Sequence, residues 1–135
     1  MAEEITSEDK YMQLQLLQQQ VGQINEYVEQ LQGQQQELGA SIKALSALQQ
    51  TRVNTEIFAP IANGIFLKAE LKDNQKLLVN VGADITVEKD IPEVIRLLEE
   101  QQEKISENIF EAGSILRELQ EQGKKLYQES GEAAE

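Results

Sequence analysis

The sequence predicts an α+β protein, mainly α, in which a long antiparallel coiled-coil hairpin carries short β-strands between its two helices. Apolar residues recur in heptads over residues 8–50 and again over residues 91–128. Between these segments, residues 54–89 alternate between apolar and polar side chains, as strands do. Aromatic residues make up 4% of the chain and tryptophan is absent, which favours extended helices over a thick globular core.

The N-terminal helix is predicted over residues 8–50. With Leu14 taken as heptad position a, nine of the ten a and d positions are apolar and the exception is Gln35. The a positions are Leu14, Val21, Val28, Gln35 and Ile42, and the d positions are Leu17, Ile24, Leu31, Leu38 and Leu45. Because the pattern is sustained over more than four heptads without a proline, it indicates a coiled coil.

The middle segment, residues 54–89, is predicted to contain four short strands. The strand at 65–71 alternates, KDNQ (72–75) is interpreted as the turn to a return strand at 77–81, and a short strand follows at 85–87. Upstream, EIFAPI (56–61) is a fourth candidate, whose proline indicates an edge strand or a bulge. Asn63-Gly64 is a strong turn signal between the first two strands.

These strands are expected to pack against other chains. Four short strands leave unpaired edges, and Phe58, Phe66 and Leu78 fall on the nominally polar face. Residues 51–90 hold six acidic and five basic side chains, so the segment is nearly neutral, as a self-associating platform would be. The residues predicted to mediate subunit assembly are Ile57, Phe58, Ile65, Phe66, Leu67, Leu77, Leu78, Val79, Val81, Ile85 and Val87.

The C-terminal helix is predicted over residues 91–128, followed by a disordered tail at 129–135. Pro92 suits the first helical turn, and Asp90 precedes it as a cap. Nine of eleven a and d positions fit the heptad pattern, and the exceptions are Gln102 and Gly123. Since the two helices have similar lengths, an antiparallel hairpin is the economical arrangement, and both helices then end together near Tyr11 and Tyr127.

Composition excludes several function classes. The chain has no cysteine and no histidine, which removes disulfides, thiol nucleophiles, the commonest general base and the commonest transition-metal ligand. The cluster of Glu99, Glu100 and Glu103 is interpreted as a solvated helix face, so no catalytic residue, metal or cofactor is expected. A net charge of −12 argues against a nucleic-acid partner.

No membrane partner is expected either. The chain has no apolar run approaching the roughly 20 residues that span a bilayer. Its first residues, MAEEITSEDK, are acidic and polar, unlike the basic start and apolar middle of a signal peptide. A cytoplasmic protein is therefore predicted.

The order of helix, four strands and helix resembles the prefoldin subunits, specifically their α class. The strongest likeness lies in EIFAPIANGIFLKAELKDNQKLLVNVGADITVEKD followed by IPEVIRLLEEQ. Similar α-class segments have an apolar-Pro-apolar first strand, a second strand alternating with Lys or Glu, a V-x-V-G third strand and a polar fourth strand that enters the helix. Here V-x-V-G is Val79-Asn80-Val81-Gly82. The resemblance covers essentially the whole chain and implies a single prefoldin-like domain at 1–135.

This resemblance implies that the strands form two short β-hairpins, which merge with those of other subunits into an intersubunit β-barrel. The expected partners are β-class prefoldin subunits and a second α copy, as an α2β4 hexamer, although some α-like members assemble with themselves. The implied function is that of an ATP-independent holdase chaperone, which captures non-native polypeptides between the coiled-coil tips and delivers these clients to a group II chaperonin.

The residues themselves indicate a client surface at the tips. Several apolar residues lie at the end of the seam or off it, and helices that fray at an open end also expose a and d residues. The predicted client-binding residues are Tyr11, Met12, Leu14, Leu16, Leu17, Ile115, Leu119, Leu126 and Tyr127. Flexible apolar tips suit weak, promiscuous capture.

Two alternatives remain open from the sequence. A structural or adaptor coiled coil without client-binding activity would need its seam but would tolerate truncation of its tips. The same tip residues could then simply complete the seam and fray. An enzyme would need a convergent catalytic constellation, and the chain offers none.

Overall fold

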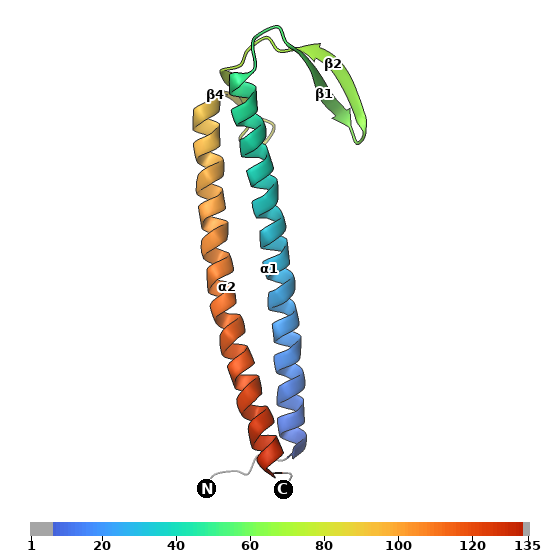
Figure 1. The fold of residues 1–135 in the computed structure, drawn as a ribbon, viewed down its shortest axis with the longest axis vertical. Helices are drawn as coiled ribbons and strands as arrows, with labels where there is room; N and C mark the ends of the chain where they lie inside the picture. The colour runs from blue at the N-terminus through green and yellow to red at the C-terminus, as the bar shows by residue number, and fades with distance from the viewer. Residues whose placement is uncertain (1–6, 134–135) are drawn as a thin grey trace. The chain divides into compact units, whose positions relative to one another are not determined.

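The structure is a computed structural model that describes residues 7–133. It divides into two compact units. The helical unit comprises the chain up to Gln35 and from Lys104 onward, and the strand unit comprises Gln36–Glu103. The element order is one helix, four strands and one helix (Figure 1). The predicted fold class is therefore confirmed: two long helices with two short antiparallel β-hairpins between them.

The two helices follow the predicted heptads closely. Helix α1 spans Ser7–Gln50 and helix α2 spans Ile91–Ala133. All the predicted a and d positions of both helices are buried or half-buried, while most of the residues between them are exposed. Leu31 and Ala112 are the most buried seam residues of the helical unit. In that unit α1 and α2 lie side by side and run in opposite directions (Figure 1).

Helix α2 ends later than predicted. Residues 129–133, expected in a disordered tail, continue the helix to Ala133, and residues 134–135 lie outside the described part of the chain. Glu129, Glu132 and Ala133 favour a helix in this segment, whereas Gly131 disfavours one, so the last seam residue alone does not mark where the helix ends.

The first hairpin joins strands β1, Glu56–Ala62, and β2, Ile65–Glu70. They pair antiparallel, with Phe58 opposite Lys68 and Pro60 opposite Phe66. The register shifts between Pro60 and Ala62, which agrees with the edge strand or bulge that the proline indicated. The predicted Asn63-Gly64 turn connects the strands, and Gly64 has a φ of 76°.

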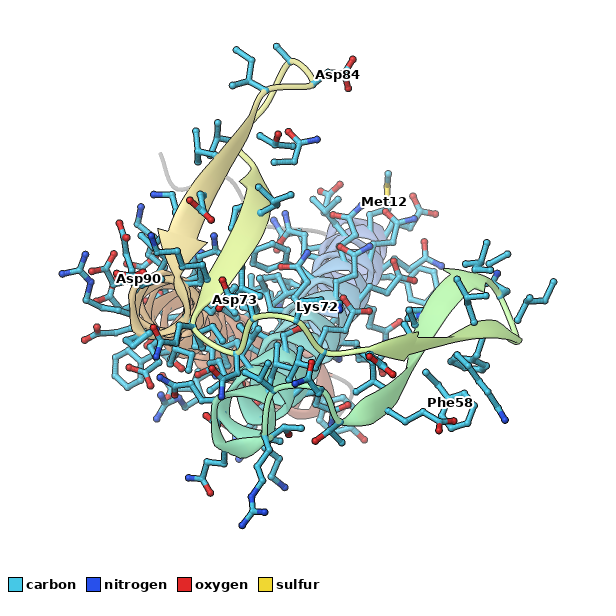
Figure 2. The ribbon with its side chains drawn as sticks, turned by 90° about the horizontal axis from the view of Figure 1, so that it is seen from above. Met12, Phe58, Lys72, Asp73, Asp84 and Asp90 are labelled. Atoms are coloured by element: carbon cyan, nitrogen blue, oxygen red, sulfur yellow. The ribbon has the colours of Figure 1, made fainter. Side chains whose placement is uncertain are left out.

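The second hairpin joins strands β3, Lys76–Asn80, and β4, Thr86–Asp90. Its turn contains three consecutive residues with positive φ: Gly82 at 116°, Ala83 at 51° and Asp84 at 60°. The side chain of Asn80 accepts a hydrogen bond from the Gly82 backbone N–H at 2.9 Å, which stabilises the entry to this turn. In Figure 2, Asp84 marks the turn of this hairpin.

One predicted pairing is wrong. The strand at 65–71 was expected to form a hairpin with 77–81 around KDNQ, but β1 pairs with β2 and β3 with β4 in two separate sheets. The residues KDNQ are a connection instead of a hairpin turn (Figure 2, Lys72 and Asp73). The carboxylate of Asp73 accepts hydrogen bonds from the backbone N–H groups of Gln75, at 2.8 Å, and Lys76, at 3.2 Å. This local turn leads into β3, which pairs with β4 and not with β2.

The connection is also attached to both helices. Asn74 Nδ2 donates to the Thr51 carbonyl, just after α1, at 3.0 Å. The backbone N–H of Ile91, at the start of α2, donates to the Gln75 carbonyl at 2.9 Å. Ile91 is fully buried, at 0% exposure. The strand unit therefore has its core where the strands meet the helices, and its hairpins extend from there.

Candidate functional site

The hairpins expose apolar side chains on both faces of the first sheet. Alternation along β1 and β2 places Phe58 and Phe66 on one face and Leu67 on the other. All three are more than half exposed, and in Figure 2 the side chain of Phe58 projects away from the ribbon. Such groups normally avoid water, so both faces are suited to packing against another chain.

The second hairpin has one partly covered face and one open face. Leu77, Val79 and Val87 are half-buried on the first, and Leu78 on the opposite face is 78% exposed. The remaining predicted assembly residues divide in the same way: Ile57 is half-buried, whereas Ile65, Val81 and Ile85 are exposed. Sequence reasoning missed Ile61, which is 65% exposed at the register shift in β1, although it stands in the segment EIFAPI.

The predicted tip residues belong to the helical unit, near the start of α1 and the end of α2. Four of them line one open groove of about 520 Å³: Leu14, Leu17, Leu119 and Tyr127. Its lining is completed by Val21, Gly123, Lys124 and three glutamines, Gln18, Gln120 and Gln128. The structure thus brings residues about 100 positions apart in the sequence into one apolar surface.

The other predicted tip residues lie outside the lining of this groove. Tyr11, Met12, Leu16 and Ile115 are exposed, and Leu126 is a half-buried seam residue. In Figure 2 the Met12 side chain points away from α1. Tyr11 also accepts a weak hydrogen bond at its hydroxyl from Gln15 Nε2 at 3.3 Å.

Two exposed aromatic residues of the helical unit were not among the predicted sites. Phe110 is 70% exposed and Tyr27 is 46% exposed. Phe110 occupies a b position of the α2 heptad, one residue after Ile109 in the seam. Because a b position faces water, the heptad pattern alone predicts that the ring of Phe110 is exposed.

A polar contact crosses the seam of the helical unit. Gln35, the polar a position of α1, donates from Nε2 to Ser106 Oγ at 2.7 Å, which satisfies part of this polar break in the seam. The described side chains form no cluster of three or more His, Cys, Asp or Glu groups that could hold a metal ion. Within residues 7–133 neither helix contains a stretch that meets the length and hydropathy needed to cross a bilayer.

Comparison with known proteins gives consistent similarities. A family model described as "Prefoldin subunit" matches residues 14–134. Among curated proteins, the chain is 24% identical over 129 residues to "Prefoldin subunit alpha" of Archaeoglobus fulgidus, covering 96% of this chain and 94% of that one. It is 31% identical over 109 residues to "Prefoldin subunit alpha" of Methanococcus aeolicus, covering 81% of this chain and 71% of the relative.

A solved structure shares the fold. A chain of the filamentous PFD from Methanocaldococcus jannaschii, seen by cryo-EM, superposes with a TM-score of 0.77 at 17% sequence identity. The match covers 87% of this chain and 98% of that chain.

Proposed function

The chain belongs to the prefoldin family, and from this premise we propose that it is the α-class subunit of a chaperone that holds non-native polypeptides without using nucleotide. Prefoldins are chaperone subunits and not an enzyme family. The proposed site of action is the open end of the helical unit, and the proposed compartment is the cytoplasm.

The observation that carries this proposal is the groove together with the exposed apolar residues near it. A coiled coil that served only as a spacer would gain nothing from Met12, Leu16 and Tyr127 exposed to water, and the last of these is 74% exposed. Apolar surface that faces water in the free protein is available to unfolded chains, which expose apolar side chains themselves. The acidic side chains on the exposed faces of the two helices favour solubility of the complex with its bound client.

We propose that the two β-hairpins mediate assembly with β-class subunits and a second α copy, as an α2β4 hexamer. The support is the exposure of Phe58, Phe66 and Leu78 on faces that a neighbouring strand pair would cover. Assembly into homomeric filaments is the other arrangement to test, because the structurally similar chain from Methanocaldococcus jannaschii is described as filamentous. Transfer of the held polypeptide to a group II chaperonin completes the proposed role.

Light scattering of a chemically unfolded, aggregating client, without nucleotide, tests this function. The assembled wild type is expected to suppress scattering. A variant with Met12→Ser, Leu16→Ser and Tyr127→Ser should lose most of this suppression, because these substitutions remove exposed apolar area while leaving the seam intact. The matched control is Tyr27→Ser with Phe110→Ser, which removes exposed aromatic area elsewhere in the helical unit.

The outcomes separate the alternatives. Equal suppression by all three proteins would overturn the assignment of the tip but preserve the holdase. No suppression by the wild type would overturn the proposed holdase function. It would favour a structural or adaptor coiled coil, whose fixed partner would bind along the two helices. Adding a group II chaperonin to the loaded wild type tests delivery, which requires the client to move to the chaperonin.

A further inference from the structure

The groove in the helical unit is lined by Gly123, a seam position without a side chain. This residue occupies heptad position a, where a coiled coil normally inserts an apolar knob into a hole formed by the facing helix. A Cβ atom built at Gly123 would meet nothing within 4 Å, so the space is open. Leu17 and Val21 of α1 line the same groove. The hole on α1 that would receive a side chain from position 123 is therefore present but empty. We call this empty hole, with Gly123 opposite it, the notch.

The groove is large enough for part of a polypeptide. Its volume of about 520 Å³ lies within the range of roughly 300–1,000 Å³ that is usual for pockets that bind small organic ligands. One large apolar side chain and the adjacent backbone fit within such a space. The aliphatic side chains of Leu14, Leu17 and Leu119 supply apolar contacts, and the ring of Tyr127 adds an aromatic one.

The polar groups of the groove point to a peptide as the occupant. Gln18, Gln120 and Gln128 line it, and each amide can both donate and accept hydrogen bonds, as peptide groups do. Such amides can pair with the backbone of an extended segment whatever its sequence.

The charge of the groove adds a preference. Among its described lining residues Lys124 is the single charged one, and it makes no ion pair with any described residue. The segment of α1 from Tyr11 to Asn25 contains no charged residue, so nothing on that helix between these positions offsets the lysine. The lining of the groove therefore carries one positive charge, on Lys124, whereas the nearest acidic residue before it on α2, Glu121, lies outside the lining. This charge complements a carboxylate.

We propose that the notch at Gly123 binds one large apolar side chain of a non-native polypeptide, which fills the space that a seam side chain would occupy. Lys124 then favours segments in which an Asp or Glu lies beside that apolar side chain. The proposal rests on the proposed holdase function and specifies the kind of segment that is held. It predicts selectivity for apolar side chains flanked by acidic residues over those flanked by basic ones.

Fluorescence anisotropy with three labelled peptides of one common backbone tests the notch, using the assembled full-length protein. The peptides carry Phe flanked by Glu, Phe flanked by Lys, and Ala flanked by Glu. The Phe–Glu peptide is expected to bind most tightly and the Ala–Glu peptide least. Replacing Glu by Lys beside Phe should weaken binding about two- to fivefold, the size expected of one solvent-exposed ion pair. This difference should vanish in about 1 M salt, where charges are screened within ~3 Å.

Two substitutions with matched controls locate the binding site. Gly123→Leu supplies the missing knob and should weaken the Phe–Glu peptide at least about tenfold. Gly33→Leu makes the same exchange at an exposed helical position with open space and should bind like the wild type. Lys124→Glu should reverse the preference between the two Phe peptides, whereas Lys125→Glu, next to it but outside the groove lining, should retain that preference.

Each result decides one part of the proposal. Wild-type binding by Gly123→Leu overturns the notch, and equal binding of the two Phe peptides overturns the role of Lys124. Aggregation suppression is measured on the same preparations. If the wild type suppresses aggregation while Gly123→Leu binds peptide unchanged, the notch is wrong and the holdase stands. If the wild type neither suppresses aggregation nor binds the Phe–Glu peptide, both proposals fall.

Discussion

Replacing a glycine by alanine should have opposite effects on stability at different positions of this chain, depending on the backbone conformation there. Gly82 has a φ of 116°, which L-residues rarely adopt, and Gly33 lies within α1 with open space around its missing Cβ. We expect Gly82→Ala to lower the free energy of unfolding by about 1–3 kcal/mol. Gly33→Ala should raise it by about 0.5–1 kcal/mol, because alanine restricts the unfolded chain and favours the helix. Urea unfolding at one fixed protein concentration measures both, and a stabilising Gly82→Ala would contradict the turn geometry.

At the same scale, the sequence predicts seam residues well and exposed sites less completely. The heptad pattern identifies each a and d position because the spacing of a coiled coil is local and regular. It also marks Gly123 as an exception, but not that the gap there opens into a groove with Lys124 at its edge. The groove depends on which residues of α1 lie opposite Gly123. Those residues are set by the register between two helical segments that are about 100 residues apart in the sequence. Phe110 is not among the predicted sites, although its b position indicates exposure.

Among the secondary-structure elements, the start of α2 carries the core of the strand unit. Ile91 is fully buried there, and its backbone N–H is bonded to Gln75. Truncating a fully buried isoleucine to alanine costs about 2–5 kcal/mol, from lost burial and the cavity left behind. We therefore expect Ile91→Ala to lower the thermal midpoint clearly. Ile115→Ala, at a half-exposed helical position, should stay within about 0.5 kcal/mol of wild type. Equal thermal midpoints for the two variants would show that Ile91 is not a core residue.

The strands show why element pairing was harder to predict than element type. Alternation at 65–71 and 77–81 correctly indicated two strands, but alternation gives the faces of a strand and not its partner. The polar run KDNQ looks like a hairpin turn in sequence. In the structure Asp73 and Asn74 use their side chains to stabilise a connection, through hydrogen bonds to Gln75, Lys76 and Thr51. Only the turn at Asn63-Gly64, whose residues favour a specific backbone geometry, was a reliable guide to pairing.

At the scale of the whole molecule, our proposals assign assembly to the hairpins of the strand unit and client binding to the helical unit, so substitutions should separate the two. Phe58→Glu with Leu78→Glu introduces two carboxylates on exposed apolar faces of the hairpins, and charge is depleted in the cores of protein interfaces. We expect this variant to sediment as a smaller species while keeping the helical signal of the wild type in circular dichroism. Gln23→Glu with Gln101→Glu adds the same charge at exposed helical positions and should assemble normally.

The assembly variant should still bind the Phe–Glu peptide, because the groove lies entirely within the helical unit of one chain. It should nevertheless suppress client aggregation poorly. On our proposal a single weak groove releases its segment quickly, whereas the two grooves of an α2β4 assembly engage one unfolded chain together and gain from high effective concentration. Analytical ultracentrifugation, anisotropy and light scattering on the same samples test this combination. Full aggregation suppression by a variant that sediments as a single chain would show that one chain suffices to hold a client, and would remove the link between assembly and function.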